Sequence, residues 1–99
     1  MTLRERIRDV IGSEWDTLRQ RHGVRRIGLF GSCARGEATD DSDVDILVEF
    51  DRVTFDRYMD VKFLLEDELG CRVDLVTAGS LKPRLRDRVL REVEYVEGR

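Results

Sequence analysis

The chain has 99 residues, of which 39% are charged and 40% hydrophobic, and its formal net charge is −3. This length suits one domain, residues 1–99, with one hydrophobic core, and it excludes a multidomain machine. The composition excludes a disordered segment. The mild acidity gives no general attraction to nucleic acid or to an anionic membrane, so we expect neither as a direct partner.

The N-terminal sequence MTLRERIRDV is charged and lacks the apolar centre of a signal peptide. No stretch approaches the roughly 18 apolar residues that a membrane helix needs, so the expected location is the cytoplasm. Cys33 and Cys71 have neither CxxC spacing nor a histidine partner, and we interpret them as reduced thiols.

The first predicted element is an amphipathic helix that ends near His22-Gly23. Its apolar residues recur every three to four positions, and they are Leu3, Ile7, Val10, Ile11, Trp15 and Leu18. A strand is predicted in VRRIGLF, residues 24–30. After a turn-rich loop, a second strand is predicted in VDILVEF, residues 44–50.

The second half of the chain predicts a helix, a strand and a last helix. Residues 54–69 have helical periodicity, with Thr54 as the N-cap and Gly70 at the end. CRVDLVT, residues 71–77, predicts a third strand, which an Ala-Gly-Ser sequence interrupts. Apolar residues at helical spacing predict a last helix over residues 81–96, with Pro83 in its first turn.

The connections predict how the strands pair. The link between the first two strands is long enough for a short helical turn and short for a crossover helix, which favours antiparallel pairing. The helix over residues 54–69 can form a right-handed crossover, which favours a parallel third strand. The predicted fold class is therefore α+β, with a small mixed β-sheet flanked by helices in a single domain.

Three aspartates lie in strand-like apolar sequence. Asp43 and Asp45 are two residues apart, so they point to the same side of a strand with Cα atoms roughly 6.5 to 7 Å apart. Asp74 occupies the matching place in CRVDLVT. Converging carboxylates can hold divalent cations for in-line displacement at phosphorus, and hard oxygen ligands favour magnesium or manganese.

The same carboxylates also allow two other interpretations. In the first, Asp43 and Asp45 cap a turn and Asp74 pairs with an arginine. This interpretation is the weaker one, because three carboxylates in strands without nearby lysines need a cation. In the second, Asp41 begins a calcium loop. That template fails, because Ile46 stands where glycine is needed and Arg52 where the bidentate glutamate belongs.

The sequence GSCARGE follows the first strand. Gly31 allows a backbone to approach a ligand closely, and Ser32 can cap a helical turn or bind an anion, so a phosphate fits there. A Walker A loop is excluded because Glu37 replaces its lysine, and GxGxxG is absent. An ordinary turn remains an alternative for Gly31-Ser32 taken alone.

The combined pattern is Gly31-Ser32, ten residues, then Asp43-Val44-Asp45, a helix, and Asp74. It resembles the nucleotidyltransferase superfamily of the DNA polymerase beta type. The resemblance is greatest to its minimal members, which are often encoded beside HEPN-domain proteins as toxin and antitoxin pairs. It covers nearly the whole chain from Val24 onward and implies a nucleotidyltransferase fold with an intact site.

The resemblance implies roles for these residues. Gly31 and Ser32 would contact the triphosphate of ATP, the substrate. Asp43 and Asp45 would hold magnesium, with two ions expected and manganese as an alternative. Asp74 would be the third carboxylate of the metal site and a candidate base for the acceptor hydroxyl.

The resemblance also implies a partner, a cognate HEPN-domain toxin with RNase activity. Transfer of AMP to a tyrosine of that toxin would silence it, and the two proteins would form a hetero-oligomer. From the residues alone, two alternatives stay open. One is a binding module that neutralises its partner by contact, and the other is a transferase that acts on a small molecule.

Other charged residues carry weaker predictions. Arg35 could bind a phosphate bidentately or pair with a neighbouring carboxylate. His22 is expected at a helix end, without a catalytic role. The last helix carries four arginines, which indicate a solvated face or a docking surface for an acidic partner: Arg84, Arg86, Arg88 and Arg91.

Overall fold

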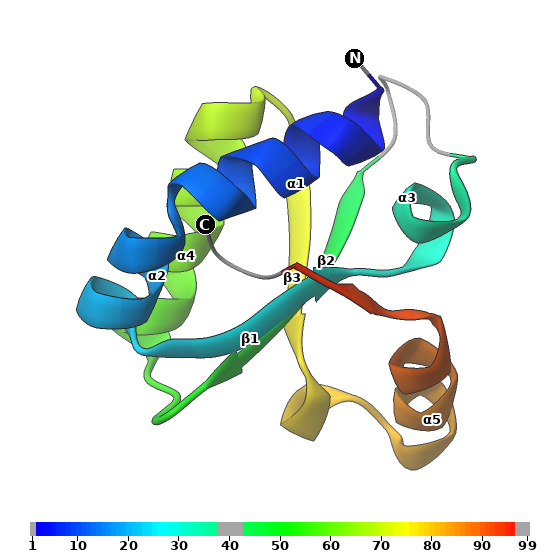
Figure 1. The fold of residues 1–99 in the computed structure, drawn as a ribbon. Helices are drawn as coiled ribbons and strands as arrows, with labels where there is room; N and C mark the ends of the chain where they lie inside the picture. Colours follow the sequence, from blue (N-terminus) through cyan, green and yellow to red (C-terminus); the bar gives the residue numbers. More distant parts are fainter. Residues whose placement is uncertain (1, 38–42, 97–99) are drawn as a thin grey trace.

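The computed structural model describes residues 2–37 and 43–96, which form one four-stranded sheet with helices around it (Figure 1). The elements in chain order are α1 Leu3–Ser13, α2 Trp15–His22, β1 Val24–Leu29, α3 Gly31–Arg35, β2 Val44–Phe50, α4 Phe55–Leu69, β3 Val73–Thr77, a 3₁₀ turn Ala78–Ser80, α5 Pro83–Glu92 and β4 Glu94–Tyr95. The predicted α+β class with a small mixed sheet is confirmed.

The strands lie in the order β3-β2-β1-β4. β1 pairs with β2 antiparallel, and β2 pairs with β3 parallel, as the lengths of the two connections predicted. The parallel pairing follows because α4 supplies the crossover between β2 and β3. This arrangement brings the first residues of β2 and β3 side by side at one end of the sheet.

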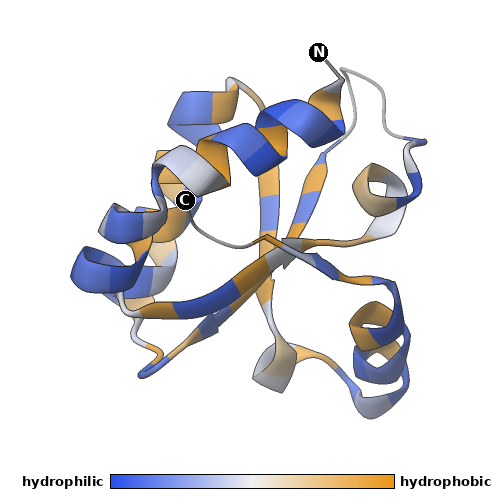
Figure 2. Ribbon diagram, in the orientation of Figure 1, coloured by the Kyte–Doolittle hydropathy of each residue, from blue (hydrophilic) through white to orange (hydrophobic). Residues whose placement is uncertain are grey.

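The main hydrophobic core lies between one face of the sheet and the helices α1, α2 and α4. Figure 2 shows apolar residues on the inner sides of these helices and along the strands. The fully buried members include Ile7, Leu18, Ile27, Ile46 and Leu65. α5 lies on the other side of the sheet, in the lower part of Figure 1, so the opposite face stays partly open.

The prediction of one continuous helix at the N-terminus is wrong. α1 ends at Ser13 and α2 begins at Trp15, with Glu14 between them in a non-helical conformation (φ −95°, ψ 6°). The Ser13 hydroxyl donates to the Val10 carbonyl, which competes with helix continuation. The apolar residues keep their helical spacing across Glu14 because both helices pack on the same core.

The last helix is also shorter than predicted. α5 ends at Glu92, Val93 is extended, and Glu94–Tyr95 form β4, which pairs with β1 at Gly28 and Leu29. The two-residue strand was not predicted, because Val93 and Val96 also fit the helical period. The Nε and Nη2 groups of Arg4 in α1 donate hydrogen bonds to both oxygens of the Glu94 carboxylate, which holds β4 against the N-terminal helix.

α4 has the predicted ends. The Thr54 hydroxyl accepts a hydrogen bond from the Arg57 N–H at 3.1 Å, and Gly70 closes the helix with a positive φ of 69°. The Tyr58 hydroxyl donates to the Leu75 carbonyl of β3. The Tyr58 contact ties the first turn of α4 to the middle of β3. The Val73 N–H donates to the Glu66 carboxylate at 3.0 Å, which fixes the later turns of α4 beside the start of β3. Among the described residues, no helix combines the length and apolar character needed to cross a membrane.

Candidate active site

The sheet places the predicted carboxylates at one end of adjacent strands. Asp45 of β2 is the direct register partner of Asp74 of β3. Asp43 precedes β2 by one residue and is two residues from Asp45. Val44, Ile46 and Val48 point into the core, so the aspartates lie on the opposite side of β2. Asp43 and Asp74 are exposed, whereas Asp45 is half-buried.

Asp45 is the electrostatic centre of this group. Burial raises the pKa of its carboxyl, and the charges of Asp74 and Asp43 and a hydrogen bond with Asp74 raise it further, while Arg35 acts in the opposite direction. The Asp45 carboxylate is therefore held beside like charges in a partly desolvated place. A cation would relieve this repulsion.

Gly31 lies directly against Asp45. Its φ is +66°, and a Cβ built on it would lie 2.5 Å from Oδ2 of Asp45. The preceding Phe30 N–H donates to the Asp45 carbonyl at 3.1 Å, so the start of α3 is fixed to the start of β2. Only glycine satisfies both the positive φ and the close approach. Ser32 follows it, half-buried, on the first turn of α3.

Arg35 forms ion pairs with two carboxylates. Its Nε lies 3.0 Å from Glu37 Oε2, and its Nη1 lies 3.2 Å from Glu92 Oε1 of α5. The alternative weighed from the sequence, pairing with a neighbouring carboxylate, therefore holds in this structure. Phosphate binding by Arg35 stays a prediction.

Two hollows adjoin the carboxylates. The first, of about 370 Å³, is lined by residues of α3, Asp45 and one side of α5, among them Gly31, Ser32, Arg35, Leu85 and Arg88. The second, of about 360 Å³, lies between α4 and the starts of β2 and β3, and its lining residues are Asp43, Lys62, Phe63, Glu66, Arg72, Val73 and Asp74.

Sequence reasoning missed the contributions of α4 and α5 to these hollows. Leu85 and Val89 fall within the apolar spacing of the predicted last helix, and Lys62 and Phe63 fall within the predicted helix over residues 54–69. Their place beside the aspartates follows from how the helices lie across the sheet. Nothing in their local spacing indicates it.

The donor chemistry fits a divalent cation. Asp45 and Asp74 offer carboxylate oxygens from adjacent strands, and Mg²⁺ is commonly bound by one or two carboxylates together with substrate phosphates. Within residues 2–37 and 43–96, no three or more His, Cys, Asp or Glu side chains are arranged to hold a metal ion by themselves. Binding by all three aspartates stays a prediction, and it requires oxygen ligands from a substrate as well.

The remaining predicted residues lie as follows. Cys33 and Cys71 are both free thiols, as expected, and burial raises the pKa of each. His22 is the last residue of α2, as expected. Of the four arginines on α5, Arg88 lines the first hollow and lies 3.7 Å from Glu92. Asp41 lies outside the described residues.

Comparison with known proteins gives consistent matches. Residues 13–96 match the family model described as a nucleotidyltransferase domain. The protein adenylyltransferase MntA of Thermococcus cleftensis is 48% identical over 93 residues, which cover 93% of this chain and 94% of that protein.

Solved structures agree in fold. A structure assigned as a minimal nucleotidyltransferase is 45% identical, with a TM-score of 0.76 and 95% of each chain covered. A Shewanella oneidensis structure of a tri-AMPylated HEPN toxin in complex with an MNT antitoxin matches with a TM-score of 0.63 at 21% identity, and 93% of this chain and 73% of that chain are covered. The second likeness shows a shared fold.

Proposed function

The chain belongs to the nucleotidyltransferase family, and from this premise we propose that it transfers AMP from ATP to a tyrosine hydroxyl of a HEPN-domain toxin and so acts as an antitoxin. The observation that carries the proposal is the register pairing of Asp45 with Asp74 directly beside Gly31. The name of the T. cleftensis relative supports protein adenylylation, and the AMPylated toxin of the S. oneidensis complex supports the choice of acceptor.

The first hollow is the proposed nucleotide site. Gly31 has no side chain between the α3 backbone and Asp45, so phosphate groups can approach the backbone there, with the proposed Mg²⁺ between them and the carboxylate. Ser32 offers a hydroxyl, and Arg35 and Arg88 offer positive charge, from the walls of the same hollow. The apolar side chains of Leu85 and Val89 form one wall of this hollow, and this wall would suit the uncharged part of the nucleotide.

Asp43 and Asp45 are the residues proposed to hold Mg²⁺, with Asp74 completing the set. The bound metal would neutralise the triphosphate and the charge that develops at phosphorus. Without a cation, the carboxylates and the triphosphate would repel one another.

Asp74 is proposed to take the proton of the acceptor. The tyrosine oxygen forms a bond to the α-phosphorus, the bond between that phosphorus and the bridging oxygen of pyrophosphate breaks, and pyrophosphate leaves. The phenolic proton passes to the Asp74 carboxylate, which is exposed in the second hollow. An acceptor in that hollow would approach from the side opposite the nucleotide.

The test combines ATP binding with transfer. Calorimetric titration of ATP should show much weaker binding in excess chelator than with Mg²⁺. Transfer of AMP from α-labelled ATP to the purified toxin should fall roughly 10²- to 10⁴-fold for Asp43→Asn or Asp45→Asn. Asp74→Asn should reduce turnover more than ATP binding.

Asp16→Asn is a matched control, because it also removes one aspartate charge, at an exposed position on α2 that lines neither hollow. It should retain most of the activity. Equal ATP affinity with and without metal would contradict the metal site, and full transfer by Asp43→Asn would contradict its catalytic role.

A further inference from the structure

α4 carries an apolar stripe that faces solvent. Phe55, Met59 and Phe63 follow one another at four-residue spacing, so their side chains lie in a row along one side of the helix. Phe55 is 77% exposed and Phe63 53% exposed, and Met59 is half-buried. The core-facing residues Val61 and Leu65 lie on a different side, so this stripe does not contribute to the core.

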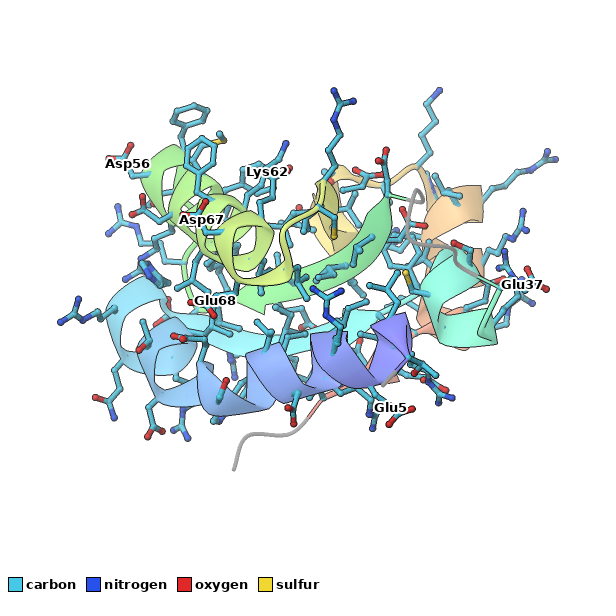
Figure 3. The ribbon with its side chains drawn as sticks, turned by 90° about the horizontal axis from the view of Figure 1, so that it is seen from above. Glu5, Glu37, Asp56, Lys62, Asp67 and Glu68 are labelled. Carbon is cyan, nitrogen blue, oxygen red and sulfur yellow. The ribbon has the colours of Figure 1, made fainter. Side chains whose placement is uncertain are left out.

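One border of the stripe is acidic. Asp56, Asp60 and Asp67 follow the same helical row, next to the apolar one, and all three are exposed. Figure 3 shows Asp56 and Asp67 on the outward side of α4. None of the three forms an ion pair with another described residue, in contrast to Arg57, which pairs with Asp51. The row is therefore an uncompensated negative border.

The other border of the stripe is the second hollow. Phe63 belongs to both, and Lys62 and Glu66 line the hollow from the same helix. Asp43 and Asp74 line its opposite wall. A polypeptide lying along the stripe would thus have the carboxylate site directly beside it.

We propose that the stripe Phe55–Met59–Phe63 with its acidic border is the docking surface for a basic, amphipathic segment of the protein acceptor, which enters the second hollow with its hydroxyl-bearing side chain. This inference rests on the proposed function for the identity of the acceptor. Apolar side chains of the segment cover the stripe, and its Lys or Arg side chains face Asp56, Asp60 and Asp67.

The charges on the two sides of the site favour this assignment. α5 carries four arginines against two acidic residues, and it contributes Leu85, Arg88, Val89 and Glu92 to the first hollow. Its net positive charge matches the triphosphate. α4 has the opposite charge and faces the second hollow. The nucleotide and the acceptor therefore reach the aspartates from different helices, as a two-substrate transfer requires.

The test uses the full chain and, as the proposed acceptor, a purified HEPN-domain toxin. Two variants change the surface: Asp60→Lys with Asp67→Lys, and Phe55→Ser with Phe63→Ser. The matched control is Asp16→Lys with Glu68→Lys, which changes net charge equally at exposed residues away from the stripe. Glu68 lies on the side of α4 that faces α1 (Figure 3).

Calorimetric titration of the acceptor without ATP should show a Kd at least about tenfold higher for both surface variants, and a Kd within about twofold of wild type for the control. The KM for the acceptor should rise in parallel for both, while kcat and the affinity for ATP stay near wild type in Asp60→Lys with Asp67→Lys, whose residues line neither hollow. Affinity of the wild-type chain should also fall with added salt.

Unchanged Kd and KM in both surface variants would overturn the docking assignment, even with AMP transfer intact. Binding that depends on the stripe without any AMP transfer would overturn the proposed function and leave the docking surface standing. If sedimentation instead shows that the wild-type chain is a dimer and that Phe55→Ser with Phe63→Ser is a monomer, the occupant of the stripe is a second copy of the chain. That result would also overturn the proposal.

Discussion

At the scale of single residues, Gly31 and Asp45 depend on each other. The positive φ of Gly31 and the 2.5 Å approach of its hypothetical Cβ to Asp45 Oδ2 mean that the site has no room for a side chain there. The sequence predicted both residues, because a glycine after a strand and aspartates two apart are local patterns. It could not predict their contact, since 13 residues separate them in the chain.

The first prediction concerns Gly31→Ala. The strain of a positive φ should cost about 1–2 kcal/mol of stability, and displacement of the Asp45 carboxylate should lower AMP transfer by about 100-fold. Gly36→Ala is the matched control, because Gly36 also has a positive φ, but beyond its chain neighbours no described residue has an atom within 4 Å of its hypothetical Cβ. It should lose stability and keep its activity. Equal activity losses in the two variants would contradict a specific contact between Gly31 and Asp45.

The second prediction concerns the pH dependence of Asp45. Because burial and the Asp74 and Asp43 charges raise its pKa in the folded state, the native protein binds more protons than the unfolded chain above the ordinary aspartate pKa of about 3.9. The protonated Asp45 carboxyl therefore makes its full contribution to the free energy of unfolding below a pH of about 3.9. This contribution is lost as the pH rises through the raised pKa of the folded state.

Metal-free Asp45→Asn should consequently be more stable than wild type at neutral pH, with a difference that shrinks as the pH falls toward 4. Urea unfolding in chelator across this range measures it, and Asp67→Asn controls for the loss of one negative charge. A less stable Asp45→Asn protein at neutral pH, or a difference independent of pH, would contradict the account.

At the scale of elements, the helix and strand types were predictable wherever the periodicity was long. β1, β2, β3 and α4 lie close to their predicted positions because each has a sustained apolar pattern with recognisable ends. The break between α1 and α2 and the strand β4 were missed. Both depend on tertiary contacts: a shared core in the first case, and pairing with β1 in the second.

The third prediction tests the attachment of β4. A Cβ on Gly28 would lie 2.6 Å from the Glu94 carbonyl oxygen and 2.9 Å from the Tyr95 Cα, so an alanine cannot fit without moving the strand. Gly28→Ala should cost about 1–3 kcal/mol of unfolding free energy. Gly79→Ala, with no atom within 4 Å of its hypothetical Cβ, should change stability much less. Urea denaturation of both variants checks this, and equal stability would show that β4 does not depend on the close approach.

At the scale of the whole molecule, the aspartates lie between two hollows that are walled by different helices. α5 and α3 bring Arg88, Arg35 and Gly31 to one side, and α4 brings Phe63 and Glu66 to the other. The carboxylates could be predicted from the sequence because two of them share a strand. The walls could not, because they come from helices whose positions are set by the sheet order and the core.

The most direct measurement is intact-mass spectrometry of the proposed partner, a HEPN-domain toxin, after incubation with the chain, ATP and Mg²⁺. The account predicts a mass gain of one or more AMP units on the partner and loss of its RNase activity. Asp43→Asn should give neither the mass gain nor, at catalytic amounts, the loss of RNase activity. Equal neutralisation by wild type and Asp43→Asn with no gain in mass would contradict the transferase account and identify a module that acts by contact alone.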